Sequence, residues 1–281
     1  MALSKMIDKS QSKSKPKAII LRTAGTNCDY ETRYAFEKAG AIVDLIHINQ
    51  LVKEKEVLDL YQIFVLPGGF TYGDDIAAGK VLANQLRHHL LNELTQFVDK
   101  GKLIIGICNG FQVLVKMGLL PGIDGKLSLK NERKQEFTLT YNDSNKFEDR
   151  WIYLRAFSNK SVFIDKDTIL YIPMANAEGK FIAGNEEKLK ALDKSEQVIF
   201  KYVDEDGNES GYPWNPNGSM GNVAGICDPT GRILGMMPHP ERYIEPTQHP
   251  RWTREGLKAE GDGMAIFQKA VDYVKGPKEE M

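Results

Sequence analysis

The chain has few cysteines and almost no net charge, and both shortages restrict what it can be. Its three cysteines, Cys28, Cys108 and Cys227, are odd in number and show no CxxC spacing, which argues against a disulfide framework and a structural zinc site. A reducing, cytoplasmic setting fits this usage. With 37 Lys and Arg against 38 Asp and Glu, the chain is a poor match for a nucleic-acid polymer or an anionic membrane surface.

Long hydrophobic runs are also missing. No apolar stretch approaches the roughly 18 residues that cross a bilayer, and residues 1–17 are rich in Lys and Ser without the apolar core of a secretory signal. We expect a disordered leader over residues 1–16 and a short tail over residues 276–281. The remaining length, with 42% apolar residues in the whole chain, predicts one domain over residues 17–275 that carries an insertion.

Strand and helix patterns alternate in the first part of the chain. Apolar strand patterns cover residues 17–22, 42–48, 63–66 and 103–107, and helical patterns cover residues 30–39, 54–61 and 76–99. This alternation predicts an α/β fold with a mostly parallel sheet and helices on both faces. Short strand patterns from about residue 135 to 205 predict an antiparallel insertion. A hairpin over residues 222–238 and a helix over about 263–274 follow.

The segment "GICNGFQ" at residues 106–112 places a cysteine between two glycines where a strand gives way to a helix. The form G-x-nucleophile-x-G marks a sharp turn that exposes a nucleophile at the carboxyl edge of a sheet. Unpaired N–H groups at the start of the helix favour a thiolate at Cys108. The alternative is a small buried cysteine in a crowded core.

A partner base decides between these two interpretations. Four of the five histidines lie in segments that suggest packing or solvent exposure: His47, His88, His89 and His249. His239, in "MMPHPERY", precedes Pro240, which favours an extended backbone, and residues i and i+2 of an extended chain share a side. Glu241 can therefore orient the imidazole of His239, as in a Cys-His-acid triad. The alternative is a merely rigid turn.

A second glycine-rich segment, "VLPGGF" at residues 65–70, also follows a strand. Thiol-based acyl transfer needs donors aimed at a tetrahedral oxyanion, and the N–H groups of Gly69 and Asn109 are the candidates, although a plain turn would look the same. Asp74 and Asp75 follow where a phosphate loop would carry Lys and Ser or Thr. Any ATP-driven step is therefore expected on another polypeptide.

With these residues assembled, the sequence resembles the class I (triad) glutamine amidotransferases, and among them the glutaminase subunits of phosphoribosylformylglycinamidine synthase in purine biosynthesis. The resemblance covers about residues 17–272. It rests on "GTNCDYE", "LPGGFTYGDDIAAGK", "GICNGFQ", "NDSNKFEDRW", "NPNGSMGNVAGI" and "MMPHPER". It implies a flavodoxin-like class I amidotransferase fold.

The resemblance also implies roles for single residues. Cys108 would attack the carboxamide of glutamine, His239 held by Glu241 would shuttle protons, and Gly69 and Asn109 would bind the oxyanion. Gln112 would help to hold the amino-acid end of the substrate, and the loop around residues 142–144 is a further candidate. One departure is Asn176, where relatives commonly carry histidine.

The resemblance further implies a partner. Ammonia would pass to a synthetase subunit that uses ATP and Mg²⁺, the complex could include one more small subunit, and this chain would hold no cofactor and no metal. Two other hypotheses stay open on the residues alone. One is a Cys-dependent peptidase or related hydrolase, since the same triad cleaves peptides. The other is a non-catalytic flavodoxin-like binding module with an ordinary thiol at Cys108.

Overall fold

The computed structural model describes residues 15–122 and 136–276. Most of the leader expected over residues 1–16 and most of the tail expected over residues 276–281 lie outside the described residues. Among the residues that the structure describes, no helix is both long enough and apolar enough to cross a bilayer.

A run of parallel strands forms one half of a nine-stranded sheet. Its order is β2 (Ile42–His47), β1 (Lys17–Arg22), β3 (Ile63–Leu66), β4 (Leu103–Ile107) and β11 (Ile233–Met236). Every residue of β3, β4 and β11 is buried, as expected of parallel strands that are covered on both faces. Their carboxyl ends therefore meet at one edge of the sheet.

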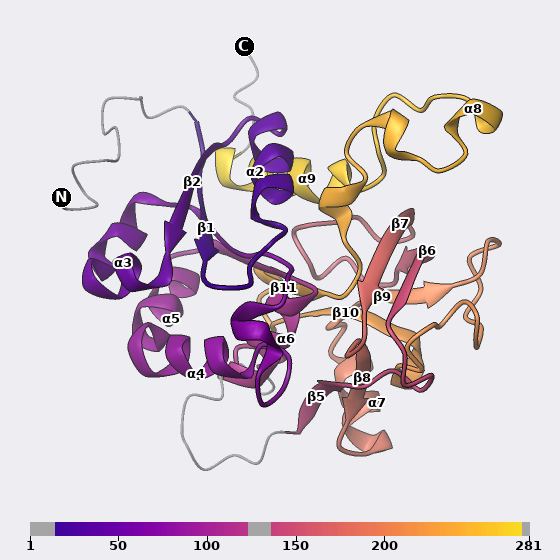
Figure 1. The fold of residues 1–281 in the computed structure, drawn as a ribbon, viewed down its shortest axis with the longest axis horizontal. Coiled ribbons are helices and arrows are strands. Elements are labelled where there is room, and N and C mark those ends of the chain that lie inside the picture. The colour runs from indigo at the N-terminus through magenta and orange to yellow at the C-terminus, as the bar shows by residue number, and fades with distance from the viewer. Residues whose placement is uncertain (1–14, 123–135, 277–281) are drawn as a thin grey trace.

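Helices cover both faces of this parallel half (Figure 1). One face carries α2 (Asp29–Lys38) and α9 (Met264–Lys275), where Phe36 packs edge-on against Phe267 with ring centroids 4.9 Å apart. The other face carries α3 (Ile48–Lys53), α4 (Lys80–His89), α5 (Leu91–Asp99) and α6 (Asn109–Met117). The predicted α/β fold is confirmed.

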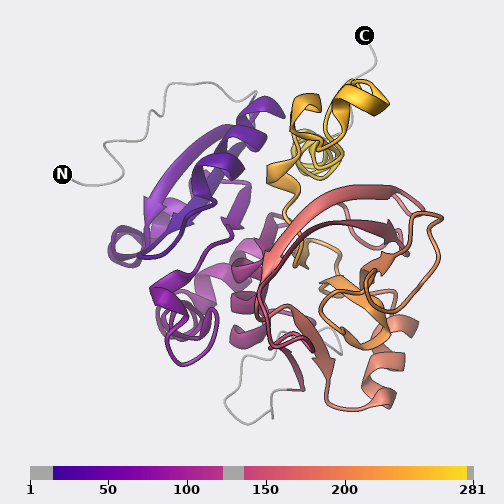
Figure 2. The same ribbon diagram turned by 45° about the vertical axis from the view of Figure 1, so that its right-hand side comes forward.

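The second half of the same sheet is antiparallel. After β11 the order continues through β10 (Val223–Cys227), β9 (Val198–Val203), β6 (Glu148–Ala156) and β7 (Ile169–Asn176). Figure 2 shows the long β6 and β7 curving around this half. The stretch expected to be an insertion thus extends the main sheet. A separate ribbon pairs β5 (Phe137–Thr140) with β8 (Lys180–Ala183), next to α7 (Glu186–Lys194).

Short helical turns complete the chain. They are the 3-10 turns η1 (Lys55–Leu60), η2 (Thr71–Asp74), η4 (Met220–Asn222), η5 (Pro240–Arg242) and η6 (Pro246–Gln248), and the single helical turn α8 (Trp252–Glu255).

Two helical predictions need correction, and one helix was not predicted. The single helix expected over residues 76–99 starts only at Lys80 and breaks at Leu90, whose φ of −131° is not helical. Leu90 is fully buried, so the break lets α4 and α5 each point an apolar stripe at the core. The helix expected over residues 54–61 is the 3-10 turn η1. The preceding α3 was not predicted, and only its first residue, Ile48, fell in the strand pattern over residues 42–48.

Candidate active site

Three neighbouring strands end at the same place in the molecule. Leu66 of β3 pairs with Gly106 of β4, and Ile107 of β4 pairs with Met236 of β11. The backbone N–H of Cys108 then donates to the carbonyl of Met236 at 2.7 Å. The segments that follow these strands contain Gly69, Cys108 and His239, so the sheet itself brings the three predicted motifs together.

Cys108 occupies a tight turn between β4 and α6. Its φ of 50° and ψ of −105° are unusual for a residue with a side chain, and such strained positions are concentrated at functional sites. The flanking glycines are required by packing: a Cβ at Gly106 would lie 2.6 Å from the carbonyl oxygen of Gly110, and a Cβ at Gly110 would lie 1.9 Å from that of Leu66. Any side chain at either position would therefore collide with the neighbouring backbone.

His239 and Glu241 form a buried hydrogen-bonded pair. Nδ1 of His239 lies 2.6 Å from Oε1 of Glu241, and each residue is 2% exposed. The backbone differs from the extended segment that the sequence suggested, because Pro240 begins the 3-10 turn η5. The backbone N–H of His239 donates to the carbonyl of Pro173 at 2.8 Å, which fixes this turn against β7.

The surroundings of His239 favour its protonated form. Burial by itself lowers the pKa of the imidazole, but the negative charge of Glu241 and the interactions with the side chains of Cys108 and Cys28 outweigh burial and leave the pKa well above its usual value. Nε2 of His239 is buried without a hydrogen-bond partner. Since Nδ1 is taken by Glu241, Nε2 is the nitrogen left to exchange a proton with the sulfur of Cys108.

The two predicted oxyanion donors have free amides. Gly69 has a φ of +140°, and the hydrogen bonds beside it run from Phe70 N to Gly25 O at 2.9 Å and from Cys28 N to Gly68 O at 3.2 Å. Among the described residues, none accepts from the N–H of Gly69 itself. The N–H of Asn109 lies in the first turn of α6, where amides lack a partner within the helix.

Gln112 is engaged by the protein itself. Its Nε2 donates to the carbonyl of Glu178 at 2.7 Å, its Oε1 accepts from Nδ2 of Asn109 at 3.0 Å, and only 4% of the residue is exposed. Oδ1 of Asn109 accepts in turn from the hydroxyl of Thr71 at 2.6 Å. Gln112 thus ties the nucleophile helix to the loop after β7.

The other residues weighed from the sequence also have partners within the protein. Asn142 is 1% exposed; its Nδ2 donates to the carbonyl of Asn176 at 2.8 Å, and its Oδ1 accepts from the N–H of Gly179 at 3.0 Å. The hydroxyl of Ser144 accepts from the N–H of Lys146 at 3.3 Å. The contacts of Asn142 indicate a structural part in holding the loop after β7, whereas Ser144 bonds within its own loop.

A buried thiol that the sequence did not single out completes the site. The ligand-type atoms of Cys28, His239 and Glu241 all lie within 4.8 Å of one another. They do not suit a metal ion, because the 2.6 Å between His239 and Glu241 is a hydrogen bond and the guanidinium of Arg242 lies 3.1 Å from the sulfur. The signal for Cys28 was its position: it follows β1, the strand beside β3.

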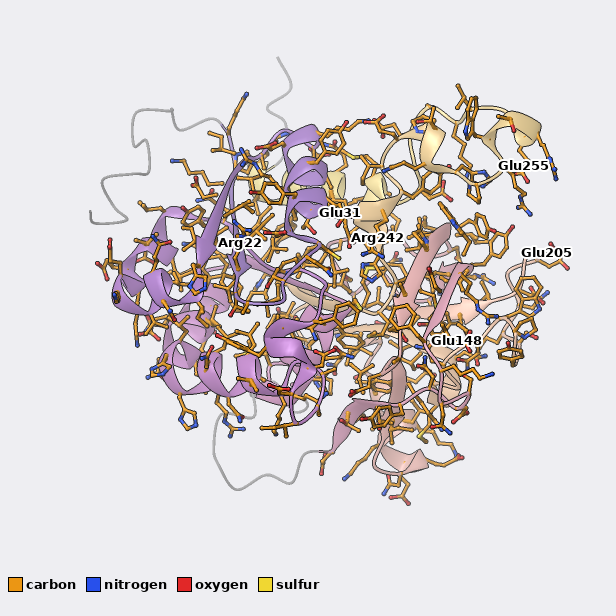
Figure 3. All side chains as sticks on the ribbon, in the orientation of Figure 1. Arg22, Glu31, Glu148, Glu205, Arg242 and Glu255 are labelled. Atoms are coloured by element: carbon orange, nitrogen blue, oxygen red, sulfur yellow. The ribbon has the colours of Figure 1, made fainter. Side chains whose placement is uncertain are left out.

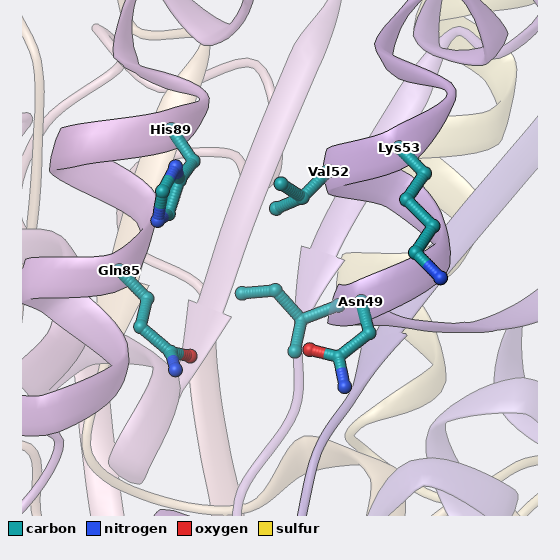
Figure 4. Close-up of a pocket in the computed structure, with 6 residues that line it drawn as sticks. Asn49, Val52, Lys53, Gln85 and His89 are labelled. Atoms are coloured by element: carbon teal, nitrogen blue, oxygen red, sulfur yellow. The ribbon is translucent and has the colours of Figure 1, made fainter.

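Two surface hollows lie apart from these residues. One of about 260 Å³ lies between α3 and α4 and is lined by Ile48, Asn49, Val52, Lys53, Gln85 and His89 (Figure 4). Another of about 450 Å³ lies where β1 and β2 end, and its lining includes Arg22, His47 and Gln50. Neither is lined by a residue of the predicted triad.

Comparisons with known proteins point to one family. The family model of CobB/CobQ-like glutamine amidotransferase domains matches residues 15–274. The PurQ subunit of phosphoribosylformylglycinamidine synthase from Dehalococcoides mccartyi is 49% identical over 265 residues, which are 93% of this chain and 99% of that protein. The PurQ subunit from Archaeoglobus fulgidus is 43% identical, over 92% of this chain and 97% of that one.

Solved structures agree with this grouping. A chain in the structure of PurLQS from Thermotoga maritima superposes with a TM-score of 0.69 at 29% identity, over 92% of this chain and 99% of that one. A putative GMP synthase component from Thermoplasma acidophilum, at 12% identity and a TM-score of 0.51 over 92% of each chain, shares the fold.

Proposed function

The chain belongs to the CobB/CobQ-like glutamine amidotransferases and, among them, to the PurQ subunits of phosphoribosylformylglycinamidine synthase, and we propose that Cys108, His239 and Glu241 carry out its glutaminase reaction. As a member of this family it hydrolyses L-glutamine and supplies the ammonia to a synthetase subunit in purine biosynthesis. The observation that carries the residue assignment is the buried His239–Glu241 hydrogen bond of 2.6 Å, which leaves Nε2 without a partner.

The geometry supports the following sequence of steps. Nε2 of His239 holds the proton that the Cys108 thiol has given up, and the sulfur attacks the carboxamide carbon of glutamine as a thiolate. The oxyanion that forms accepts hydrogen bonds from the N–H groups of Gly69 and Asn109. The imidazolium then protonates the amide nitrogen, the carbon–nitrogen bond breaks, and ammonia leaves a glutamyl thioester. Water, deprotonated by His239, attacks the thioester, and glutamate and the thiol are released.

Replacing Cys108 tests this assignment. In the complex reconstituted with its synthetase subunit, Cys108→Ala is expected to abolish synthesis from glutamine, because no sulfur remains to form the thioester, while synthesis from added ammonium salt continues. Cys227→Ala is the matched control, since it removes another buried thiol, at the end of β10. Glutamine-dependent turnover by the Cys108→Ala complex would disprove the assignment.

The peptidase hypothesis makes a different prediction. The family match over residues 15–274 favours glutamine as the substrate. We expect a diazo-ketone analogue of glutamine to label Cys108 and peptide substrates to be left intact. Peptide cleavage that depends on Cys108 would favour the hydrolase instead.

The partner and the setting complete the proposal. ATP and Mg²⁺ would bind the synthetase subunit, which agrees with Asp74 and Asp75 standing where a phosphate loop would need Lys and Ser or Thr. A further small subunit is a second expected partner, since the similar chain from Thermotoga maritima comes from a structure of PurLQS. Affinity capture of this chain from the native cell, followed by peptide identification, tests whether the synthetase subunit and the small subunit bind to it.

The expected cellular setting is the cytoplasm. The three free cysteines fit a reducing compartment.

A further inference from the structure

The imidazole of His239 has a sulfur neighbour besides the predicted nucleophile. Sγ of Cys28 lies 4.0 Å from Nδ1 of His239, on the nitrogen that also bonds to Glu241, and Cys28 is fully buried. The backbone at Gly68 closes the same space: a Cβ there would lie 2.8 Å from Cε1 of His239 and 3.2 Å from Sγ of Cys28. The edge of the ring that carries Nδ1 and Cε1 is thus covered by one sulfur and one glycine.

Cys28 is itself fixed from several directions. Its N–H donates to the carbonyl of Gly68 at 3.2 Å, and its carbonyl accepts from the hydroxyl of Thr32 at 2.6 Å. Its thiol donates to Oδ1 of Asn27 at 3.2 Å, while Nη2 of Arg242 donates to the sulfur at 3.1 Å. A side chain with this many contacts at the start of α2 is held in one position, and so is the ring edge that it covers.

The charges around the ring explain why an uncharged thiol suits this position. His239 faces Glu241 and Cys108, and behind Cys28 lies Arg242, whose Nε is 3.8 Å from Oε1 of Glu31. Figure 3 shows Arg242 and Glu31 beside one another. Burial raises the pKa of the Cys28 thiol, so it stays neutral. The neutral sulfur fills the space between guanidinium and imidazole, and because a thiol sulfur is only a weak acceptor it competes little with Glu241 for the N–H at Nδ1.

From this geometry we propose that Cys28 is a positioning residue for the glutaminase reaction. Its sulfur holds the imidazole of His239 in the hydrogen bond to Glu241 and so keeps Nε2 directed at Cys108. The inference rests on the proposed function of the triad and adds a residue to it. A serine is shorter and a stronger hydrogen-bonding group than cysteine, and an alanine leaves an unfilled space beside the ring.

Kinetics of the reconstituted complex test the inference. Cys28→Ala is expected to lower kcat for glutamine about 10-fold or more, as small misplacements of reacting groups do. KM for glutamine should stay within about twofold, because Cys28 is fully buried. The limb of the pH profile that His239 controls should shift to lower pH. Cys28→Ser should recover part of kcat, since its hydroxyl can still accept from Arg242, and synthesis from ammonium salt should be unchanged.

Cys227→Ala separates positioning from simple loss of a buried thiol. It is expected to lower stability without changing kcat per folded molecule or the pH profile. An unchanged kcat and pH profile in both Cys28 variants, or an equal loss of kcat in Cys227→Ala, would overturn the inference. If Cys28→Ala does not fold, Cys28→Ser decides by the same two readouts. The Cys108→Ala complex should be inactive with glutamine whether or not Cys28 positions His239. A failure of this inference can therefore be distinguished from a failure of the proposed triad.

Discussion

The protonation of a single residue, His239, links the site to the stability of the protein. The pKa of His239 is well above its usual value in the folded state. Its protonation therefore makes its full contribution to the free energy of unfolding at pH values below the unfolded pKa of about 6.5. As pH rises from there towards the folded pKa, only the folded state keeps the proton, and the free energy of unfolding falls by up to about 1.4 kcal/mol per pH unit.

Glu241→Gln should reduce this pH dependence. The substitution removes a negative charge that counteracts the effect of burial on His239, so the imidazole loses its proton at lower pH in the folded protein. We expect urea unfolding between pH 6 and pH 9 to show a shallower decline for Glu241→Gln than for the wild type. Groups common to both proteins cancel in the comparison. Parallel curves would show that Glu241 does not hold the proton on His239.

Some residues of the site could be predicted from sequence and others could not. Cys108 and His239 lie in short motifs that can be recognised from the sequence alone. Two glycines flank the nucleophile, and a proline follows the histidine. The approach of Cys28 to His239 spans 211 positions and depends on β1 lying beside β3. The engaged amide of Gln112 likewise depends on Glu178, which a distant strand brings into place.

At the scale of single elements, the seating of α6 on the sheet decides where Cys108 lies. Gly110→Ala is expected to destabilise the protein by about 1–3 kcal/mol, as overpacking does, because the new Cβ would lie 1.9 Å from the backbone carbonyl of Leu66. The helix must shift to relieve this contact, and glutamine-dependent activity should fall with it. Urea unfolding and steady-state kinetics measure the two effects.

Gly211→Ala is the matched control for this change. A Cβ at Gly211 would meet nothing within 4 Å, so the free energy of unfolding should stay within about 0.5 kcal/mol of the wild type. Equal behaviour of the two variants would mean that the close contact between α6 and β3 does not constrain the nucleophile turn.

Element boundaries were harder to predict than element types. The strands β1, β3 and β4 follow their apolar patterns closely, because strands buried on both faces contain little else. The region of residues 76–99 reads as one continuous amphipathic helix, but Gly79 and Leu90 adopt backbone angles that separate α4 from its flanks. Leu90 is fully buried, and hydrophobic periodicity alone does not report such local changes of backbone angle.

On the scale of the whole molecule, one continuous sheet joins the two halves. The ladder from β4 through β11 to β10 changes from parallel to antiparallel without a gap. His239 follows β11, the strand at this change, and its N–H bonds to Pro173 of β7. The position of the imidazole therefore depends on both halves, and each half should be stable only when the other is folded.

Unfolding measured in both halves tests this dependence. All three tryptophans, Trp151, Trp214 and Trp252, lie after residue 150, so fluorescence reports the later part of the chain, whereas far-UV circular dichroism is dominated by the helices around the parallel half. We expect the two signals to show one coincident urea transition, because the shared sheet makes unfolding cooperative.

A pair of core variants sharpens this test. Phe64→Ala in β3 removes a fully buried ring that packs on Phe97, and Phe200→Ala removes another fully buried ring, in β9. Each should destabilise the protein by about 3–5 kcal/mol and should shift the fluorescence and circular dichroism midpoints by equal amounts. If Phe64→Ala moved only the dichroism transition and Phe200→Ala only the fluorescence transition, the halves would unfold independently, and the sheet could not be what holds His239 opposite Cys108.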